Sequence, residues 1–202
     1  MPRVKKPAVR VGRRPSTSAA EISAVGIDLF AAKGFDQTSV DEIAEAANIA
    51  RRTFFRYFPS KNAVPWGDFD VHLAQMRAGL EALPAELTIA EGLRRVLLEF
   101  NTFPDEESDT HRQRMSLILG APSLQAYSML MYTGWRHAVA VYVASKLKCG
   151  PADHLPQTVA WMLLGVALSA YEHWLSDDSL DLQRLLAEGA DSLQSGLGGL
   201  GR

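Results

Sequence analysis

The chain of 202 residues contains a single cysteine, Cys149, so it cannot form an intrachain disulfide. Sparse cysteine is typical of proteins from a reducing compartment. No apolar run reaches the length that spans a membrane, since the longest, at residues 159–170, is interrupted by Gly165 and Ser169. The basic N-terminus lacks the apolar stretch of a signal peptide. We therefore expect a cytoplasmic protein that does not enter a membrane.

The common signatures of catalysis are also missing. The histidines match no metal-ligand spacing such as HExxH, and no glycine-rich phosphate or dinucleotide loop is present. Glu172 and His173 are adjacent, and neighbouring side chains diverge on a helix. We expect no enzyme and no resident metal or cofactor. The remaining alternatives are a protein that binds a partner molecule and regulates it, and an interaction module without a regulatory role.

No segment alternates apolar and polar residues with a period of two, whereas apolar residues recur at helical spacing through most of the chain. This pattern predicts an all-α protein. The nine expected helices span residues 18–33, 38–47, 51–57, 60–82, 89–103, 110–119, 123–147, 156–176 and 179–196.

The net charge of -2 conceals an uneven distribution. Residues 1–60 carry ten Lys or Arg and six Asp or Glu, whereas residues 61–202 carry eleven and seventeen. A basic N-terminal part directs that end of the protein towards phosphates, and an acidic remainder is repelled by them.

The segment TSVDEIAEAANIARRTFFRYFPSK, residues 38–61, is the most informative part of the chain. Thr38, with Asp41 three residues later, has the spacing of a helix N-cap. Asn48 then interrupts the helical pattern, and asparagine tolerates the left-handed backbone of a sharp turn. One apolar helix face is predicted, formed by Val40, Ile43, Ala44 and Ala47.

The second helix of this segment, residues 51–57, places Phe54 inward and its arginines outward, and Pro59 prevents it from continuing. Two helices joined by a tight turn, the second rich in arginine, predict a helix-turn-helix whose second helix enters the DNA major groove. The alternative is a surface helical hairpin with solvated charges.

The segment resembles the DNA-binding domain of the TetR (tetracycline repressor) family. The resemblance rests on Gly34-Phe35-x-x-Thr38, on Asp41-x-Ile43-Ala44-x-x-Ala47, and on Arg51-x-Thr53-x-x-x-Tyr57-Phe58-x-Ser60-Lys61. The predicted order of helices, a small N-terminal group followed by a larger helical body, is similar to the family over essentially the whole chain. The resemblance implies a basic arm at 1–15, a three-helix DNA-binding domain at 16–60, a helical effector and dimerisation domain at 61–196, and a flexible tail at 197–202.

The same resemblance implies a homodimer on double-stranded operator DNA. Arg51 and Arg52 open the recognition helix and are expected to reach base edges. Other positions match phosphate contacts of the family, and the arm either enters the minor groove or only aids solubility. The expected DNA-binding residues are Arg13, Arg14, Thr38, Arg51, Arg52, Thr53, Phe55, Arg56, Tyr57 and Lys61. The chain departs from the family at Phe55, where tyrosine is usual, and at Ala50, where serine is usual.

The last two expected helices carry apolar residues and small residues at helical spacing. The family implies a four-helix dimer interface here, although an ordinary intrachain core explains part of the pattern. The expected dimer residues are Trp161, Leu164, Gly165, Leu168, Leu182 and Leu186.

Met and aromatic residues between 66 and 171 predict either an ordinary core or an elongated apolar effector pocket. A cationic cluster at residues 111–114 either receives an anionic head group or pairs with the acidic residues at 105–109. The expected ligand residues are Met76, Phe100, Arg112, Arg114, Met115, Leu119, Tyr127, Met131, Trp135 and Tyr171.

Four further segments resemble the regulators found with mycofactocin biosynthesis genes in actinobacteria: FPSKNAVPWGDFD, FNTFPDEE, HRQRMSLILGAPSLQAYSMLMYTGWR and AYEHWL. This resemblance implies a transcription factor that controls mycofactocin biosynthesis genes. The wider family implies a repressor released by a hydrophobic small molecule, with a long-chain acyl-CoA as the expected effector. An activator, or a regulator of another redox, lipid or efflux operon with a different effector, is the alternative.

Overall fold

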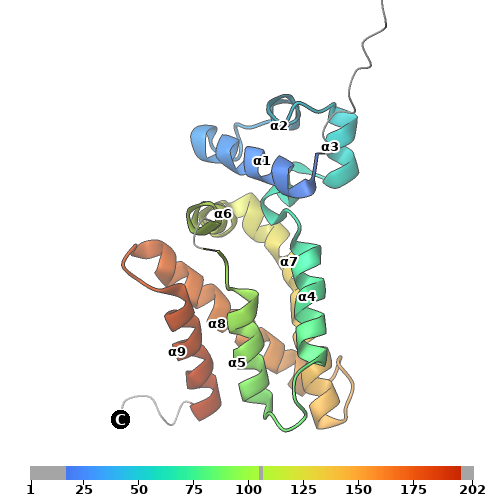
Figure 1. The fold of residues 1–202 in the computed structure, drawn as a ribbon, viewed down its shortest axis with the longest axis vertical. Helices are drawn as coiled ribbons and strands as arrows, with labels where there is room; N and C mark the ends of the chain where they lie inside the picture. Colours follow the sequence, from blue (N-terminus) through green and yellow to red (C-terminus); the bar gives the residue numbers. More distant parts are fainter. Residues whose placement is uncertain (1–16, 105–106, 197–202) are drawn as a thin grey trace, which may run out of the picture.

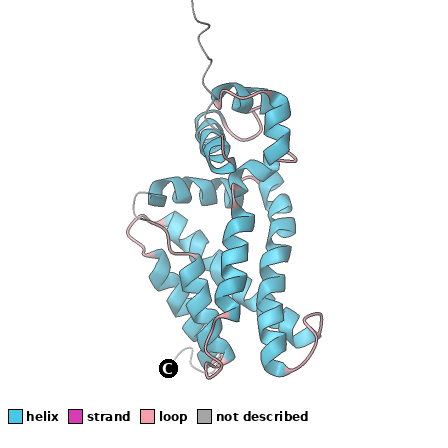
Figure 2. Cartoon of the chain, turned by 45° about the vertical axis from the view of Figure 1, so that its right-hand side comes forward, coloured by secondary structure: helices cyan, strands magenta, loops and turns pink. Residues whose placement is uncertain are grey.

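The computed structural model describes residues 17–104 and 107–196, and within them every regular element is a helix (Figure 2). This confirms the predicted all-α fold. In chain order the elements are α1 (Ala19–Lys33), α2 (Val40–Ala46), α3 (Arg51–Tyr57), the 3-10 helix η1 (Lys61–Trp66), α4 (Phe69–Glu81), α5 (Ile89–Phe100), α6 (Ser108–Gly120), α7 (Pro122–Leu147), α8 (His154–Ser176) and α9 (Leu182–Ser195).

Helices α1–α3 form a small head at one end of the molecule (Figure 1). Their apolar faces close around one core, which includes Phe30, Ile43 and the fully buried Phe54. Val64 of η1 and Leu124 of α7 belong to the same core. The head is therefore attached to the rest of the chain by shared apolar packing as well as by the backbone.

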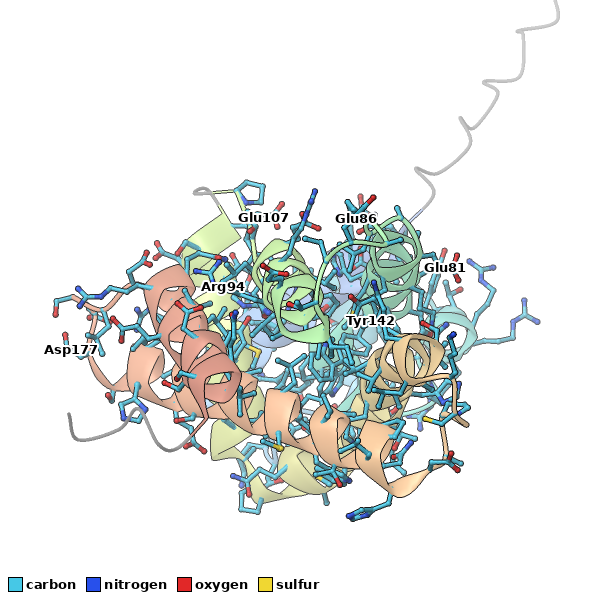
Figure 3. All side chains as sticks on the ribbon, turned by 90° about the horizontal axis from the view of Figure 1, so that it is seen from below. Glu81, Glu86, Arg94, Glu107, Tyr142 and Asp177 are labelled. Carbon is cyan, nitrogen blue, oxygen red and sulfur yellow. The ribbon has the colours of Figure 1, made fainter. Side chains whose placement is uncertain are left out.

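The other helices form the body, in which α7 and α8 pack along each other and α9 packs against both α8 and α5. Seen from below, the helices enclose a common interior, and the charged Glu81, Glu86 and Asp177 lie at the periphery (Figure 3). Tyr142 is buried, and its ring meets Gly92 of α5 so closely that any larger residue there would collide with it. The body thus buries its apolar helix faces against one another.

The predicted N-cap of α2 is wrong by one residue. Ser39 caps the helix, and Ser39 and Glu42 exchange side-chain-to-backbone hydrogen bonds as a capping box. Thr38 is instead buried, and its hydroxyl donates to the Gly34 carbonyl oxygen at 2.9 Å. Its methyl group suits this inward position, whereas the smaller and more polar Ser39 is left to face solvent.

The single helix predicted over residues 60–82 is also wrong. It is divided into η1 and α4 at Gly67, whose φ of 52° and ψ of -116° are not helical. A glycine adopts this backbone at little cost, and Pro65 restricts the turn before it. The remaining predicted helices begin and end within three residues of the observed ones.

Candidate DNA interface and effector cavity

The turn between α2 and α3 has the geometry that the sequence predicts. Asn48 adopts a left-handed backbone with φ 51°, which directs the chain sharply into α3. Phe54 is fully buried in the head core, whereas Arg51, Arg52 and Arg56 are exposed. Because Phe54 fixes the rotation of the helix, the three guanidinium groups are held on its solvent side.

Arg51 has intramolecular partners in the free protein. Its Nη1 lies 2.5 Å from Oδ2 of Asp41 on α2, and its guanidinium lies 5.5 Å from the centre of the Phe55 ring. Phe55 is 46% exposed, so the pair of side chains stands on the surface. Ala50 at the N-cap offers no side-chain hydrogen bond to α3, as its sequence implied.

Two predicted phosphate contacts are occupied in holding the head together. The Tyr57 hydroxyl donates to the Thr17 carbonyl oxygen at the start of α1. Lys61 Nζ donates to the carbonyl oxygens of Phe35 at 2.7 Å and of Thr38 at 2.9 Å. Thr38 is too buried for its hydroxyl to contact phosphate, so we withdraw it from the predicted interface.

Thr53 is half-buried and Arg56 lies over the Tyr57 ring, 5.0 Å from its centre. Because Thr53 is partly exposed and Arg56 is exposed, both remain in the predicted interface. Arg13 and Arg14 lie outside the described residues, so the predicted role of the arm stays a prediction.

A cavity of about 100 Å³ lies in the body between α4, α5, α6, α7 and α8. Five predicted ligand residues contribute to its wall, namely Phe100, Arg114, Met115, Trp135 and Tyr171. The other five do not: Met76, Arg112, Leu119, Tyr127 and Met131. The wall also contains Trp66 and Phe69 from the predicted apolar set, His111 from the predicted cationic cluster, and Tyr132, which sequence reasoning did not name. The aromatic residues among them could be recognised in the sequence. The break at Gly67, which allows Trp66 and Phe69 to line the same wall, could not be predicted from it.

A chain of hydrogen bonds crosses the cavity wall. The Tyr171 hydroxyl donates to Asn101 Oδ1 at 2.7 Å and lies 2.8 Å from His111 Nε2. Because the only hydroxyl proton points to Asn101, His111 must donate from Nε2, which leaves Nδ1 as an acceptor. Burial, reinforced by the charge of Arg114, lowers the pKa of His111 to about 3, so the ring is neutral near pH 7.

Four buried polar atoms of the cavity wall have no hydrogen-bond partner within the described part of the chain: Trp66 Nε1, His111 Nδ1, Arg114 Nε and the Tyr132 hydroxyl oxygen. Burial lowers the pKa of Arg114, although a guanidinium stays charged near neutral pH. An apolar cavity with two free N–H donors, one free hydroxyl and one free ring-nitrogen acceptor suits a ligand that is mainly hydrocarbon but carries oxygen atoms.

Arg112 has a different environment, although it is only two residues from Arg114. Its Nη1 donates to the Trp174 carbonyl oxygen at 2.7 Å and lies 3.0 Å from Asp178, and its guanidinium stacks on the Trp174 ring. It therefore ties α6 to the end of α8 outside the cavity. Its ion-pair partner is Asp178 rather than the acidic loop that the sequence suggested.

The outer face of α8 carries large exposed apolar side chains, namely Leu155, Trp161 and Met162. Gly165 lies on the same face, with open space beside it. By contrast, three residues are covered within one chain, and we withdraw them from the predicted dimer surface: Leu164, Leu182 and Leu186. Leu168 is half-buried and also reaches the cavity.

The head meets the cavity at η1. The Ser23 hydroxyl of α1 donates to the Val64 carbonyl oxygen at 2.7 Å, and both groups are buried. A Cβ on Gly26 would lie 2.4 Å from Val64 Cγ1, so α1 and η1 are in tight contact. Trp66, two residues beyond Val64, forms part of the cavity wall. The six-residue 3-10 helix η1 therefore touches both the head core and the cavity.

Comparisons with known proteins agree with this geometry. Residues 22–64 match the family model described as bacterial regulatory proteins, tetR family, and residues 87–198 match the one described as MftR C-terminal domain. None of the helices in the described ranges 17–104 and 107–196 is long and apolar enough to cross a membrane.

Among curated relatives, the candidate mycofactocin biosynthesis transcriptional regulator MftR of Mycobacterium tuberculosis is 54% identical over 93% of this chain and 95% of its own length. The HTH-type transcriptional regulator EthR of Mycolicibacterium smegmatis is 29% identical over 82% of this chain and 76% of its own. Among solved structures, the Thermus thermophilus transcriptional repressor FadR, in complex with lauroyl-CoA, superposes with a TM-score of 0.60 at 21% identity, covering 89% of this chain and 94% of that one. With both family models matched and a relative of this similarity, the chain belongs to the TetR family of transcriptional regulators and carries the MftR type of C-terminal domain.

Proposed function

We propose that this regulator is a homodimeric repressor of mycofactocin biosynthesis genes that a long-chain acyl-CoA releases from DNA. The observation that carries its DNA binding is α3, where buried Phe54 holds Arg51, Arg52 and Arg56 on the solvent side. An exposed arginine-rich helix that follows a tight turn can enter the major groove, where arginine reads guanine and contacts phosphate.

The exposed face of α8 supports the dimer. Trp161 and Met162 are each about half exposed, and Gly165 leaves space for a close approach of a second α8. Arg136 of α7 lies 3.7 Å from the centre of the Trp161 ring, so the aromatic ring is already positioned. A two-fold axis through this face would bury the largest exposed apolar side chains of α8.

The effector proposal rests on the cavity and on two relatives. The walls of the cavity are mostly apolar, and Arg114 and Trp66 offer free N–H donors to oxygen atoms of a ligand. The name of the 54% identical relative supplies the mycofactocin genes as the proposed target, and the Thermus protein with bound lauroyl-CoA supplies the acyl-CoA class.

The size of the cavity explains how such a ligand would act. About 100 Å³ is less than the ~300–1,000 Å³ of typical ligand pockets, so a long acyl chain must push the surrounding helices apart. A ligand can shift the protein only towards a conformation that it binds more tightly. An expanded cavity displaces Trp66, and through η1 it changes the position of the head.

Selection of duplexes from a random library by the purified protein tests DNA binding, and recovery of a palindrome with two half-sites supports the dimer. Acyl-CoAs of increasing length are then titrated against the selected complex. We expect release that strengthens with chain length, is weakened by Arg114→Met and is retained by the matched Arg112→Met. Selection of no sequence refutes the DNA proposal, and release at no chain length refutes the effector. Transcription in vitro from the selected site separates repression from activation.

A further inference from the structure

The first two arginines of α3 differ in the free protein. Arg51 contacts both the Asp41 carboxylate, 2.5 Å away, and the Phe55 ring, whose centre is 5.5 Å away. Arg52 has no ion-pair or hydrogen-bond partner for its side chain within the described residues. The sequence alone gives both the same role, whereas the structure separates an arginine that has an ion-pair partner from one that has none in the described residues.

The local charge explains why Arg51 needs a counterion. Both arginines occupy the first turn of α3, at the positive end of its backbone dipoles. The first turn contains no acidic residue and Ala50 provides no cap. The nearest compensation comes from α2, where Asp41 is within contact distance of Arg51.

We infer that Asp41 is a positioning residue for sequence specificity, because it fixes Arg51 in the orientation that reads a base edge. This rests on the proposed binding of DNA. A guanidinium has five N–H donors, and the ion pair engages Nη1, so the other donors remain free for the O6 and N7 atoms of guanine. The Phe55 ring, 5.5 Å from the guanidinium, is a second contact that limits its movement.

Fixing Arg51 in advance favours the correct base in two ways. A surface arginine loses much rotamer freedom when it binds, and a side chain that is already held loses less. Asp41 is itself exposed, so its carboxylate repels the phosphates of every duplex. Only a duplex whose bases Arg51 contacts compensates for this repulsion, which disfavours the others. Arg52, without such a partner, is the arginine that adapts to phosphate.

The test compares duplex preferences selected from a random library by the full-length protein and by its variants. Asp41→Ala removes the carboxylate from Arg51, and Glu45→Ala removes a matched exposed carboxylate from α2, whose side chain has no partner in the described ranges. We expect Asp41→Ala to lower discrimination at one base position per half-site by about threefold to tenfold. Asp41→Glu should restore part of it, and Glu45→Ala should leave the base preference unchanged.

A double-mutant cycle with Arg51→Ala identifies the route of the effect. Arg51→Ala should lower discrimination at the same position, and Asp41→Ala should add nothing further in that background. If Asp41→Ala leaves the ranking of duplexes unchanged and only strengthens binding to all of them, Asp41 merely repels phosphate and the inference is wrong. If the unaltered protein selects no sequence, the proposed DNA binding has failed instead.

Discussion

Substituting alanine for glycine at two helical positions should have opposite effects on stability. Gly26 of α1 and Gly79 of α4 both lie within helices, where alanine is more favourable than glycine by about 1 kcal/mol. Beside Gly79 there is open space, so Gly79→Ala should raise the free energy of unfolding by up to about 1 kcal/mol. Beside Gly26 the new methyl group would lie 2.4 Å from Val64 Cγ1.

Val64 cannot easily retreat from that methyl group. It is fully buried, and a β-branched side chain has few rotamers. Overpacking of this kind costs about 1–3 kcal/mol, so Gly26→Ala should be less stable than Gly79→Ala by that amount. Urea unfolding at one fixed protein concentration, followed by circular dichroism, measures both values, and the fixed concentration removes the contribution of dimerisation.

A second substitution tests the mechanism. Val64→Ala removes the colliding methyl groups, so it should be less harmful in the Gly26→Ala background than alone, with a coupling energy of about 0.5–3 kcal/mol. Equal stabilities of Gly26→Ala and Gly79→Ala would refute the tight contact between α1 and η1.

Three further outcomes are expected. In the folded protein the pKa of His111 is about 3, whereas in the unfolded chain it is near 6.5, so the free energy of unfolding should fall by up to about 1.4 kcal/mol per pH unit as the pH drops from 6.5 to 3. The fall should be smaller in His111→Gln, and urea midpoints measured over this pH range test it. An equal pH dependence of the two proteins would contradict it. Trp161→Asp should convert the proposed dimer into a folded monomer in analytical ultracentrifugation, whereas the same change at exposed Val71 of α4 should not; a variant that stays dimeric would remove α8 from the proposed interface. Tyr57→Phe removes the hydrogen bond to Thr17 and should lower thermal stability by about 1 kcal/mol, and an unchanged melting temperature would show that this bond contributes nothing.

The arrangement of the recognition helix could be predicted because its signals are local. The spacing of Phe54 relative to the arginines fixes which side faces the core, and Asn48 marks the turn. The cap of α2 could not be assigned to one residue, because Thr38 and Ser39 are both hydroxyl residues followed by an acidic residue three positions later. The tertiary burial of Thr38 decides between them, and a cap pattern contains no information about that.

The cavity was harder to predict because its residues are distant in sequence. Arg112 and Arg114 are indistinguishable by composition, yet two positions on a helix differ by about 200° in direction. One side chain therefore meets the cavity and the other the end of α8, and only the packing of α6 determines which. The same limit applies to α8 and α9, where apolar residues alone do not separate a face that packs within the chain from one that meets a second copy.

The energy of the contacts around η1 is comparable to what the proposed release of DNA by an effector would require. A hundredfold loss of affinity corresponds to about 2.7 kcal/mol. Leaving the buried Val64 carbonyl oxygen without the Ser23 hydroxyl would cost about 1–3 kcal/mol, and disturbing the packing of Val64 on Gly26 would add to it. Pro65, which joins Val64 to Trp66, restricts the backbone between the two, so a ligand that displaces Trp66 is expected to displace Val64 as well. One local rearrangement at η1 can therefore couple binding of a ligand in the cavity to the proposed release of DNA by the head, because the cavity wall and the head core share this six-residue 3-10 helix.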